Sequence, residues 1–434
     1  MVSLHRILTK NTENVIMGQN IIQKNRFFLT LVACVLTTIY FFVYKNPEQI
    51  ESKSNFYLSA YPSLSRKEID VWMTNRQLLL TNLSKLGEVL FLNVSEPEAI
   101  DKRYEILIWK YGYTIENRHL KQYSHKRIDP FEYCPVKNCD LRFSDKSIST
   151  ADIVIFHLHR IKGVDDLPKR QDSKQIWAFL TDESPYNTFL QSKNNTLKNY
   201  NGLFNWSMTY RSDSDIPVPY GRTVLKKWPI KRQNQIYEKK LDVLVAILGS
   251  NCGGQNHRWD YVKQLQKFIQ VDVYGGCGPF KKSCPGHFKS DCPAIENYIF
   301  YLSFENSNCN EYITEKLWWN AYAKNSIPIV MGSSQTTYKA LLPPGSYINT
   351  EDYANPNALA YHILSLNKSG EYRKYYRWQE KFQVLNEHGY FGSKSYHYCR
   401  ICQAVNYNNK DHKVYNDLES YWSVKRDCHS SWDA

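Results

Sequence analysis

Residues 298–332 constrain the fold of this chain more than any other segment of its sequence. Tyr298–Phe304 is a continuous apolar run, Ile313–Lys324 has apolar residues at helical spacing, and Ile327–Met331 is a second apolar run. Short apolar runs on either side of a helix are typical of buried strands in a parallel sheet. The segment therefore predicts a right-handed strand–helix–strand unit and an α/β fold.

Polar side chains gather where the first predicted strand ends and the helix begins. They are Glu305, Asn306, Tyr312, Glu315 and Lys316. Open α/β sheets bind ligands at this edge, and helix N-termini attract phosphate, although a polar loop that only caps a helix has similar residues. Glu315 and Lys316 are adjacent and point to different sides. One can face a sugar or ribose hydroxyl while the lysine reaches a phosphate.

The rest of the chain alternates strands and helices in two blocks. Strands are expected at 104–110, 152–157, 175–180 and 204–210, then at 241–248 and 271–274, with a helix at 256–269. Residues 226–240 are polar and basic, as in a linker. We therefore expect two Rossmann-like domains that face a cleft, at 101–235 and 236–365, followed by a C-terminal segment at 366–434.

The net charge of the chain is +13, but its basic residues are scattered, with short pairs such as Lys226–Lys227 and no long basic run. This distribution does not favour nucleic-acid binding. A basic cleft for an anionic nucleotide fits better. Aromatic residues make up 15% of the chain, which suits sugar stacking, although ordinary core and surface positions also use them.

Near the N-terminus, Phe27–Tyr44 is a stretch of 18 residues without a charge. As a helix it would be about 27 Å long, enough for a thin bilayer. Basic residues dominate the preceding tail, 1–26, which the positive-inside rule places in the cytosol. A cleaved signal peptide is the alternative, but the polar lead is long and no small-residue cleavage site follows Tyr44. We expect an uncleaved type II signal anchor and a stem at 45–100.

Eleven cysteines occur, of which Cys34 lies in the apolar stretch. The other ten would be lumenal, where an even number indicates up to five disulfides of open connectivity. Cys399-x-x-Cys402 also suits zinc or redox chemistry, but without a second matching pair a structural disulfide role is preferred. The disulfide candidates that we single out are Cys134, Cys139, Cys399 and Cys402.

Asn-x-Ser/Thr sequons support a lumenal location. We expect glycosylation at Asn82, Asn93, Asn194 and Asn367, and not at Asn205, which lies in an apolar run.

The segment FYLSFENSNCNEYITEKLWWNA at 300–321 closely resembles the donor-binding signature of the α1,3/α1,4-fucosyltransferases, glycosyltransferase family ten. Two further segments resemble the same family in the same order: Glu183-Ser184-Pro185 after an apolar strand, and FNWSMTYRSDSDIPVPYG at 204–221. The type II anchor and the late Cys-x-x-Cys also fit. The resemblance covers roughly residues 100–430.

This resemblance implies a GT-B fold, GDP-fucose as donor and inversion at the anomeric carbon. It implies a donor site made of Asn306, Tyr312, Glu315 and Lys316, with Arg258 at the diphosphate. Direct displacement needs a general base for the acceptor hydroxyl and positive charge for the leaving diphosphate. We assign the catalytic base to Glu183, with Asp182 and Glu305 as rivals, and the neutralising charge to Arg258 and Lys316.

Metal ligands are not expected in the site. Asp213-Ser214-Asp215 resembles the Mn²⁺-binding pattern of many glycosyltransferases, but a structural loop role is preferred because two cationic side chains can replace a metal. We expect no obligatory cofactor, and Mn²⁺ at most stimulates. The Gly-rich run 275–278 can approach a nucleotide or form a plain turn.

The acceptor is less constrained by the resemblance. Members that act on Lewis-type acceptors carry a His-His-Trp/Arg-Asp/Glu pattern where this chain has His157-Leu158-His159-Arg160. His157 and His159 alternate on a predicted strand and should share one face, in a hydrogen-bonding or acceptor-site role rather than a metal site. The N-glycan core GlcNAc and the LacNAc or Lewis-type antenna both stay open.

Together these features predict a Golgi membrane α1,3-fucosyltransferase with a lumenal catalytic part that acts on GlcNAc in glycoprotein glycans. The alternatives are a catalytically inactive lumenal glycan-binding protein on the same scaffold and a transferase for another nucleotide sugar. The complete set of predicted site residues argues against the first, and the match at 298–332 argues against the second.

Overall fold

The computed structural model describes residues 61–99, 101–110, 112–121, 127–190, 194–228, 239–280, 284–285, 290–411 and 413–429. The predicted tail at 1–26 and anchor Phe27–Tyr44 lie outside these ranges. Within them, no helix is both long and apolar enough to cross a membrane. Residues Ser63–Ala434 form one compact unit, and the description below concerns that unit.

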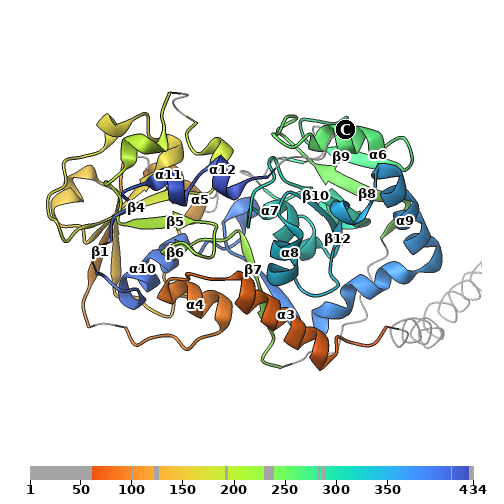
Figure 1. Cartoon of the computed structure of the whole chain (residues 1–434), viewed down its shortest axis with the longest axis horizontal. Helices are drawn as coiled ribbons and strands as arrows, with labels where there is room; N and C mark the ends of the chain where they lie inside the picture. The colour runs from red at the N-terminus through yellow and green to blue at the C-terminus, as the bar shows by residue number, and fades with distance from the viewer. Residues whose placement is uncertain are drawn as a thin grey trace, which may run out of the picture. The chain divides into compact units, whose positions relative to one another are not determined.

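The first sheet of this unit is six-stranded and entirely parallel, with the order β2-β1-β3-β4-β5-β6. Figure 1 labels β1, β4, β5 and β6 of this sheet. Its central strands are buried apolar runs, as expected for a sheet covered on both faces. Its strands are β1 (Tyr104–Ile108), β2 (Cys139–Arg142), β3 (Ile153–His157), β4 (Ile176–Thr181), β5 (Trp206–Thr209) and β6 (Ile216–Pro217).

The second sheet is five-stranded and parallel, with the order β12-β11-β10-β8-β9. β10 is buried at every residue and lies in the middle. It pairs directly with β11, so the predicted strand–helix–strand unit is confirmed. The strands are β8 (Lys240–Leu248), β9 (Val271–Tyr274), β10 (Tyr298–Phe304), β11 (Ile327–Met331) and β12 (Ile348–Asn349).

The helix between β10 and β11 is shorter than predicted. Instead of Ile313–Lys324, only α7 (Glu315–Trp318) is α-helical, and a 3-10 turn follows at Tyr322–Lys324. The amide of Asn320 bonds to the carbonyl of Glu315, five residues back, so the α-helical register is lost after Trp318. Trp318 packs so closely on β7 (Gly221–Leu225) that a Cβ at Gly221 would lie 2.5 Å from its ring.

Two helices precede the first sheet, in the region predicted as a stem. α3 (Arg66–Leu79) packs on α8 (Gln335–Leu341), and α4 (Lys85–Leu92) packs on β6 and α10 (His397–Tyr407). α3 begins with a reciprocal capping box between Ser65 and Glu68, a pattern that satisfies two free amide groups.

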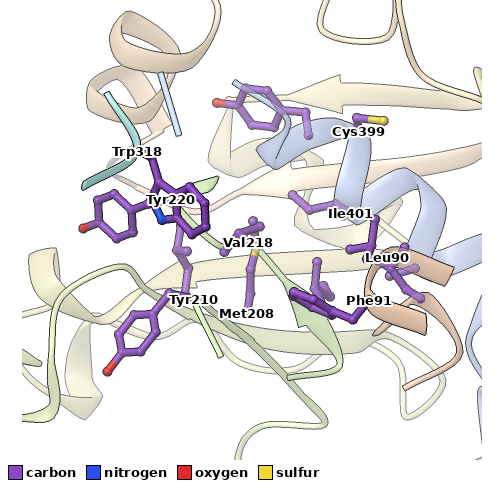
Figure 2. Packing of buried hydrophobic residues seen from close by; sticks show 14 of the residues in the cluster. Leu90, Phe91, Met208, Tyr210, Val218, Tyr220, Trp318, Cys399 and Ile401 are labelled. Atoms are coloured by element: carbon purple, nitrogen blue, oxygen red, sulfur yellow. The ribbon is translucent and has the colours of Figure 1, made fainter. Parts of the chain in front are cut away.

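The C-terminal segment packs on both sheets. α9 (Pro356–Ser369) packs on α6 (Arg258–Leu265), β13 (Phe382–Asn386) pairs antiparallel with β7, and α10 packs on β1. The largest hydrophobic core follows the same path. It joins Leu90 and Phe91 of α4, Met208 of β5, Trp318 of α7 and Ile401 of α10 (Figure 2).

Five disulfides join the ten cysteines that were expected to be lumenal. Both cysteines of the Cys-x-x-Cys pair bond back to the first sheet region, as Cys134–Cys399 and Cys139–Cys402. The remaining three are Cys252–Cys277, Cys284–Cys292 and Cys309–Cys428. The Cys-x-x-Cys motif therefore has a structural role in this fold, as preferred from the sequence.

Candidate active site

Glu183 lies just after β4, at the carboxyl end of the first sheet. Its Oε2 accepts a hydrogen bond of 3.0 Å from the hydroxyl of Tyr312 and one of 3.5 Å from Nδ2 of Asn306. Next to it, Ser307 Oγ donates to Ser184 Oγ at 2.8 Å. The structure therefore brings the predicted base together with two residues of the predicted donor site, from loops after β4 and β10.

Tyr312 itself is buried, and its pKa is raised well above the ordinary value by burial and by Glu183. It therefore stays protonated and donates to the carboxylate. Both bonds fall on Oε2 of Glu183. Among the residues that the structure describes, no hydrogen bond to Oε1 is present.

Lys316 lies between two carboxylates at the start of α7. Its Nζ is 3.0 Å from Oε2 of Glu305 and 3.3 Å from Oε1 of Glu315. Burial opposes the ammonium charge, but Glu305 and Glu315 together raise the pKa of Lys316. Its Nζ also donates to Oγ1 of Thr314 at 2.8 Å, so an anionic ligand would bind Lys316 by replacing one of these three partners.

Glu305 is fully engaged in this network. Its Oε1 accepts from the amide and hydroxyl of Thr314 at 2.8 and 3.0 Å. Burial raises the pKa of Glu305, and Lys316 opposes that shift. Gly332 faces it, with φ +143° and a would-be Cβ 2.7 Å from the Cβ of Glu305. Glu305 therefore orients Lys316 and the start of α7, which leaves it poorly placed as the base.

Arg258 begins α6 and lies buried against backbone carbonyls. Nη1 donates to Phe304 at 3.0 Å, Nη2 to Asn251 at 2.7 Å and Nε to Gly253 at 3.2 Å. Burial lowers its pKa, and Glu305 opposes that effect. A guanidinium has five N–H groups, so two remain after these three bonds. Arg258 shapes the loop that precedes α6, and this loop meets the end of β10.

Asp182, the other rival base, is buried and paired with Arg118. Nε2 of His157 is 3.5 Å from its Oδ1. Although burial raises the pKa of an acid, Arg118 and His157 hold that of Asp182 well below its ordinary value. The hydroxyl of Tyr220 also donates to its carbonyl at 2.6 Å. Asp182 is thus buried and held by Arg118 and His157, although it directly precedes Glu183 in the sequence.

The two histidines near the predicted acceptor region are close, though not on one strand. β3 ends at His157, and His159 lies in a 3-10 turn, Leu158–Arg160, so the prediction that both sit on a strand is wrong. Their rings stack with centroids 5.8 Å apart, and Nδ1 of His159 is 2.9 Å from the carbonyl of Asn187.

The Asp213-Ser214-Asp215 run makes structural contacts. Asp213 pairs with Arg211 and, at 3.4 Å, with Arg426. Asp215 accepts from the amide of Ser207 at 2.8 Å. These contacts support the preferred structural loop role. The Gly-rich run 275–278 forms a turn after β9, with Gly275 at φ +82° and Cys277 disulfide-bonded to Cys252.

The predicted glycosylation sites differ in exposure. Asn82, Asn93 and Asn194 are exposed and Asn367 is partly exposed. Asn205 is buried and bonds to the amide of Trp177 and the carbonyl of Lys413, so a glycan could not be attached there without disrupting the fold.

Several contributors to the site were not found from the sequence. Arg118 pairs with Asp182 across 64 residues, and Ser307 reaches Ser184 across 123. The positions of Arg118 and Ser307 could not be singled out by apolar periodicity. Ser184 and Ser307 each lie inside a recognised motif, which was the only signal available for them.

The chain is similar over most of its length to known fucosyltransferases. Residues 101–221 match the sequence model of an N-terminal fucosyltransferase domain, and residues 237–422 match the C-terminal domain of glycosyltransferase family 10 (fucosyltransferase). Glycoprotein 3-alpha-L-fucosyltransferase A of Drosophila melanogaster is 34% identical over 307 residues, 69% of this chain and 57% of the relative's length.

Alpha-(1,3)-fucosyltransferase 7 of Rattus norvegicus is 33% identical over 323 residues, 74% of this chain and 80% of that protein. Among solved structures, an α1,3-fucosyltransferase crystallised with GDP-fucose is 16% identical and has a TM-score of 0.43. That match covers 77% of this chain and 98% of the crystallised one.

Proposed function

Because the chain belongs to glycosyltransferase family 10, the fucosyltransferases, we propose that it transfers L-fucose from GDP-fucose to the 3-hydroxyl of GlcNAc in glycoprotein glycans. The observation that carries this proposal is the hydrogen bond from Tyr312 to Glu183. It joins the proposed base on the first sheet to the donor motif on the second.

The proposed reaction is one direct displacement that inverts the anomeric carbon. Oε1 of Glu183 accepts the proton of the acceptor 3-hydroxyl as its oxygen attacks C1 of fucose. The C1–O bond to the diphosphate breaks, and GDP leaves with the bonding electrons. Tyr312 and Asn306 hold Oε2 and so orient the carboxylate, a role that residues near a general base often have.

Positive charge at the leaving diphosphate comes from Lys316 and Arg258 in this proposal. Lys316 is oriented by Glu305, and Arg258 retains two N–H groups beyond its carbonyl contacts. Fixed charges of this kind stabilise a leaving anion without reorganisation. Glu315 and Asn306 are proposed to bind hydroxyl groups of the donor. No obligatory cofactor is proposed, and Mn²⁺ is assigned at most a stimulating effect.

We also propose a type II orientation in the Golgi membrane, with Phe27–Tyr44 as anchor and the described part of the chain in the lumen. Five disulfides support an oxidising compartment, and exposed sequons at Asn82, Asn93 and Asn194 support lumenal modification. Treatment of the full chain with a glycosidase should lower its mass. In sealed vesicles, the catalytic part of the chain should be protected from added protease. A cytosolic, protease-accessible catalytic part would contradict this orientation.

The activity is tested by incubating the purified full chain with GDP-fucose and a panel of GlcNAc-containing glycans. The panel holds N-glycans with an accessible core GlcNAc and LacNAc-terminated antennae, which separates the two acceptor classes. Linkage analysis by NMR should show fucose in α linkage to the 3-position of GlcNAc. A β linkage would contradict inversion, and absence of transfer to every member of the panel would overturn the proposed function.

A further inference from the structure

A large groove lies on the first sheet's side of the molecule, against the loop that carries Glu183. Its volume is about 1010 Å³. One wall is the loop after β4, with Pro185, Tyr186 and Phe189. The other is formed by α11 (Leu418–Tyr421) and α12 (Val424–Asp427) near the C-terminus. The groove therefore begins two residues after Glu183 in the same loop.

Three contacts fix the walls of this groove. Nε1 of Trp422 donates to Oγ1 of Thr188 at 2.9 Å and ties the C-terminal wall to the β4 loop. The disulfide Cys309–Cys428 ties the end of α12 to the donor loop after β10. Ser184 accepts from Ser307. These contacts hold the walls of the groove to the loop that carries Glu183 and to the donor loop after β10.

The chemistry of the lining fits an oligosaccharide. Tyr186 is 42% exposed and offers an aromatic face to the apolar side of a sugar ring. Asp417, Glu419 and Lys425 provide acceptors and donors for hydroxyl groups. Ligand pockets typically measure ~300–1,000 Å³, so a groove at the top of that range holds several sugar rings rather than one.

We propose that this groove binds the part of the acceptor glycan that extends beyond the reacting GlcNAc, with Tyr186 as its stacking platform. This inference rests on the proposed function and specifies its acceptor as an extended oligosaccharide. A glycan attached at the reacting GlcNAc must leave the neighbourhood of Glu183, and the loop that carries Glu183 leads into the wall of this groove. Tyr186 thereby determines acceptor specificity without taking part in the transfer itself.

The test compares Tyr186→Ala with wild type on a length series of free acceptors, from the methyl glycoside of GlcNAc to a complete N-glycan. Wild-type kcat/KM should rise by about tenfold or more with length, and Tyr186→Ala should lose most of that gain through KM, as the loss of a stacked ring predicts. The rate with the monosaccharide should not change. Tyr361→Ala is the matched control, since Tyr361 is 77% exposed on α9, which packs on α6 and does not line the groove.

Isothermal titration of the full chain with the free N-glycan gives a second readout that does not need transfer. The groove is supported as a glycan-binding site if Tyr186→Ala weakens binding and Tyr361→Ala does not. This holds even if no transfer occurs, because the absence of transfer would contradict only the proposed function. Equal losses on short and long acceptors would overturn the proposal. A wild-type kcat/KM that does not rise with the length of the acceptor would also overturn it.

Discussion

At the scale of single residues, the hydroxyl of Tyr312 decides how the Glu183 carboxylate is oriented. Tyr312→Phe removes the 3.0 Å hydrogen bond and keeps the buried ring. We expect kcat for fucose transfer to fall by about ten- to a hundredfold, because a positioned base contributes up to about 10²–10⁴-fold in all. GDP affinity should stay near that of wild type in a calorimetric titration.

Tyr361→Phe, on the exposed face of α9, is the control for this change and should have full activity. A Tyr312→Phe enzyme with wild-type kcat would show that the bond has no catalytic consequence. Loss of GDP affinity would instead support the donor-binding role that the family resemblance implies for Tyr312.

Glu311 gives the fold a pH dependence of its own. Burial and the charge of Asp213 raise its pKa to about 6, while Ser212 donates two bonds to the carboxylate at 2.8 and 3.0 Å. At pH values between the ordinary pKa of a glutamate and about 6, Glu311 is therefore protonated more often in the folded state than in the unfolded chain. The contribution of Glu311 to the free energy of unfolding is therefore largest at low pH. It falls by up to about 2 kcal/mol as the pH rises through about 6.

Glu311→Gln should remove this dependence, since the amide does not titrate. Denaturant unfolding of both chains at several pH values measures it. Relative to Glu311→Gln, wild type should lose stability from pH 4.5 to 7. A constant difference between the two chains across that range would contradict a raised pKa for Glu311.

At the scale of elements, the joint between β10 and α7 depends on a glycine in the turn that follows β11. Gly332 has φ +143°, and a Cβ there would lie 2.7 Å from Cβ of Glu305. Gly332→Ala should therefore lower the free energy of unfolding by about 2 kcal/mol or more and disturb Lys316 through Glu305. A lower melting temperature and weaker GDP binding are expected together.

Gly163→Ala is the matched control, because Gly163 has extended φ and no atom lies within 4 Å of the position that an alanine Cβ would take there. It should melt within about a degree or two of wild type, since open extended positions tolerate alanine. A Gly332→Ala chain as stable as the Gly163→Ala chain would mean that the β10–α7 joint can relax around a side chain.

Strands were more predictable from this sequence than helices. β9, β10 and β11 begin and end where the apolar runs do, because buried parallel strands are continuous apolar segments. α7 ends early, at Trp318, whose ring lies against Gly221 of β7, a contact that no local pattern reveals. β7 and β13 were not predicted, since their pairing joins residues more than 150 positions apart.

At the scale of the whole molecule, the disulfide Cys309–Cys428 ties the donor loop to the C-terminus across 119 residues. Replacing both cysteines by serine removes a long-range constraint on the unfolded chain, worth about 4–5 kcal/mol in the loop-entropy description. The double variant should melt several degrees lower and bind GDP more weakly. Unchanged melting in scanning calorimetry would show that packing alone holds this loop.

The active site could be predicted from the sequence residue by residue but not as an arrangement. Glu183, Asn306 and Tyr312 were each identified from motifs, and the structure brings them within hydrogen-bonding distance. They meet because the regions of the first and second sheets share one hydrophobic core. That core is built from long-range contacts, which local periodicity does not reveal. The engagement of Glu305 with Thr314, which weakens its claim to be the base, became visible for the same reason only in three dimensions.

The most direct test of the account is Glu183→Gln in the full chain, measured for fucose transfer and for GDP binding side by side. Glutamine keeps the size of the side chain and removes its ability to accept the proton of the acceptor hydroxyl. We expect transfer to fall by about a thousandfold or more, with the Kd for GDP within about threefold of wild type. Retained transfer would exclude Glu183 as the base, and lost GDP binding would assign it to the donor site instead.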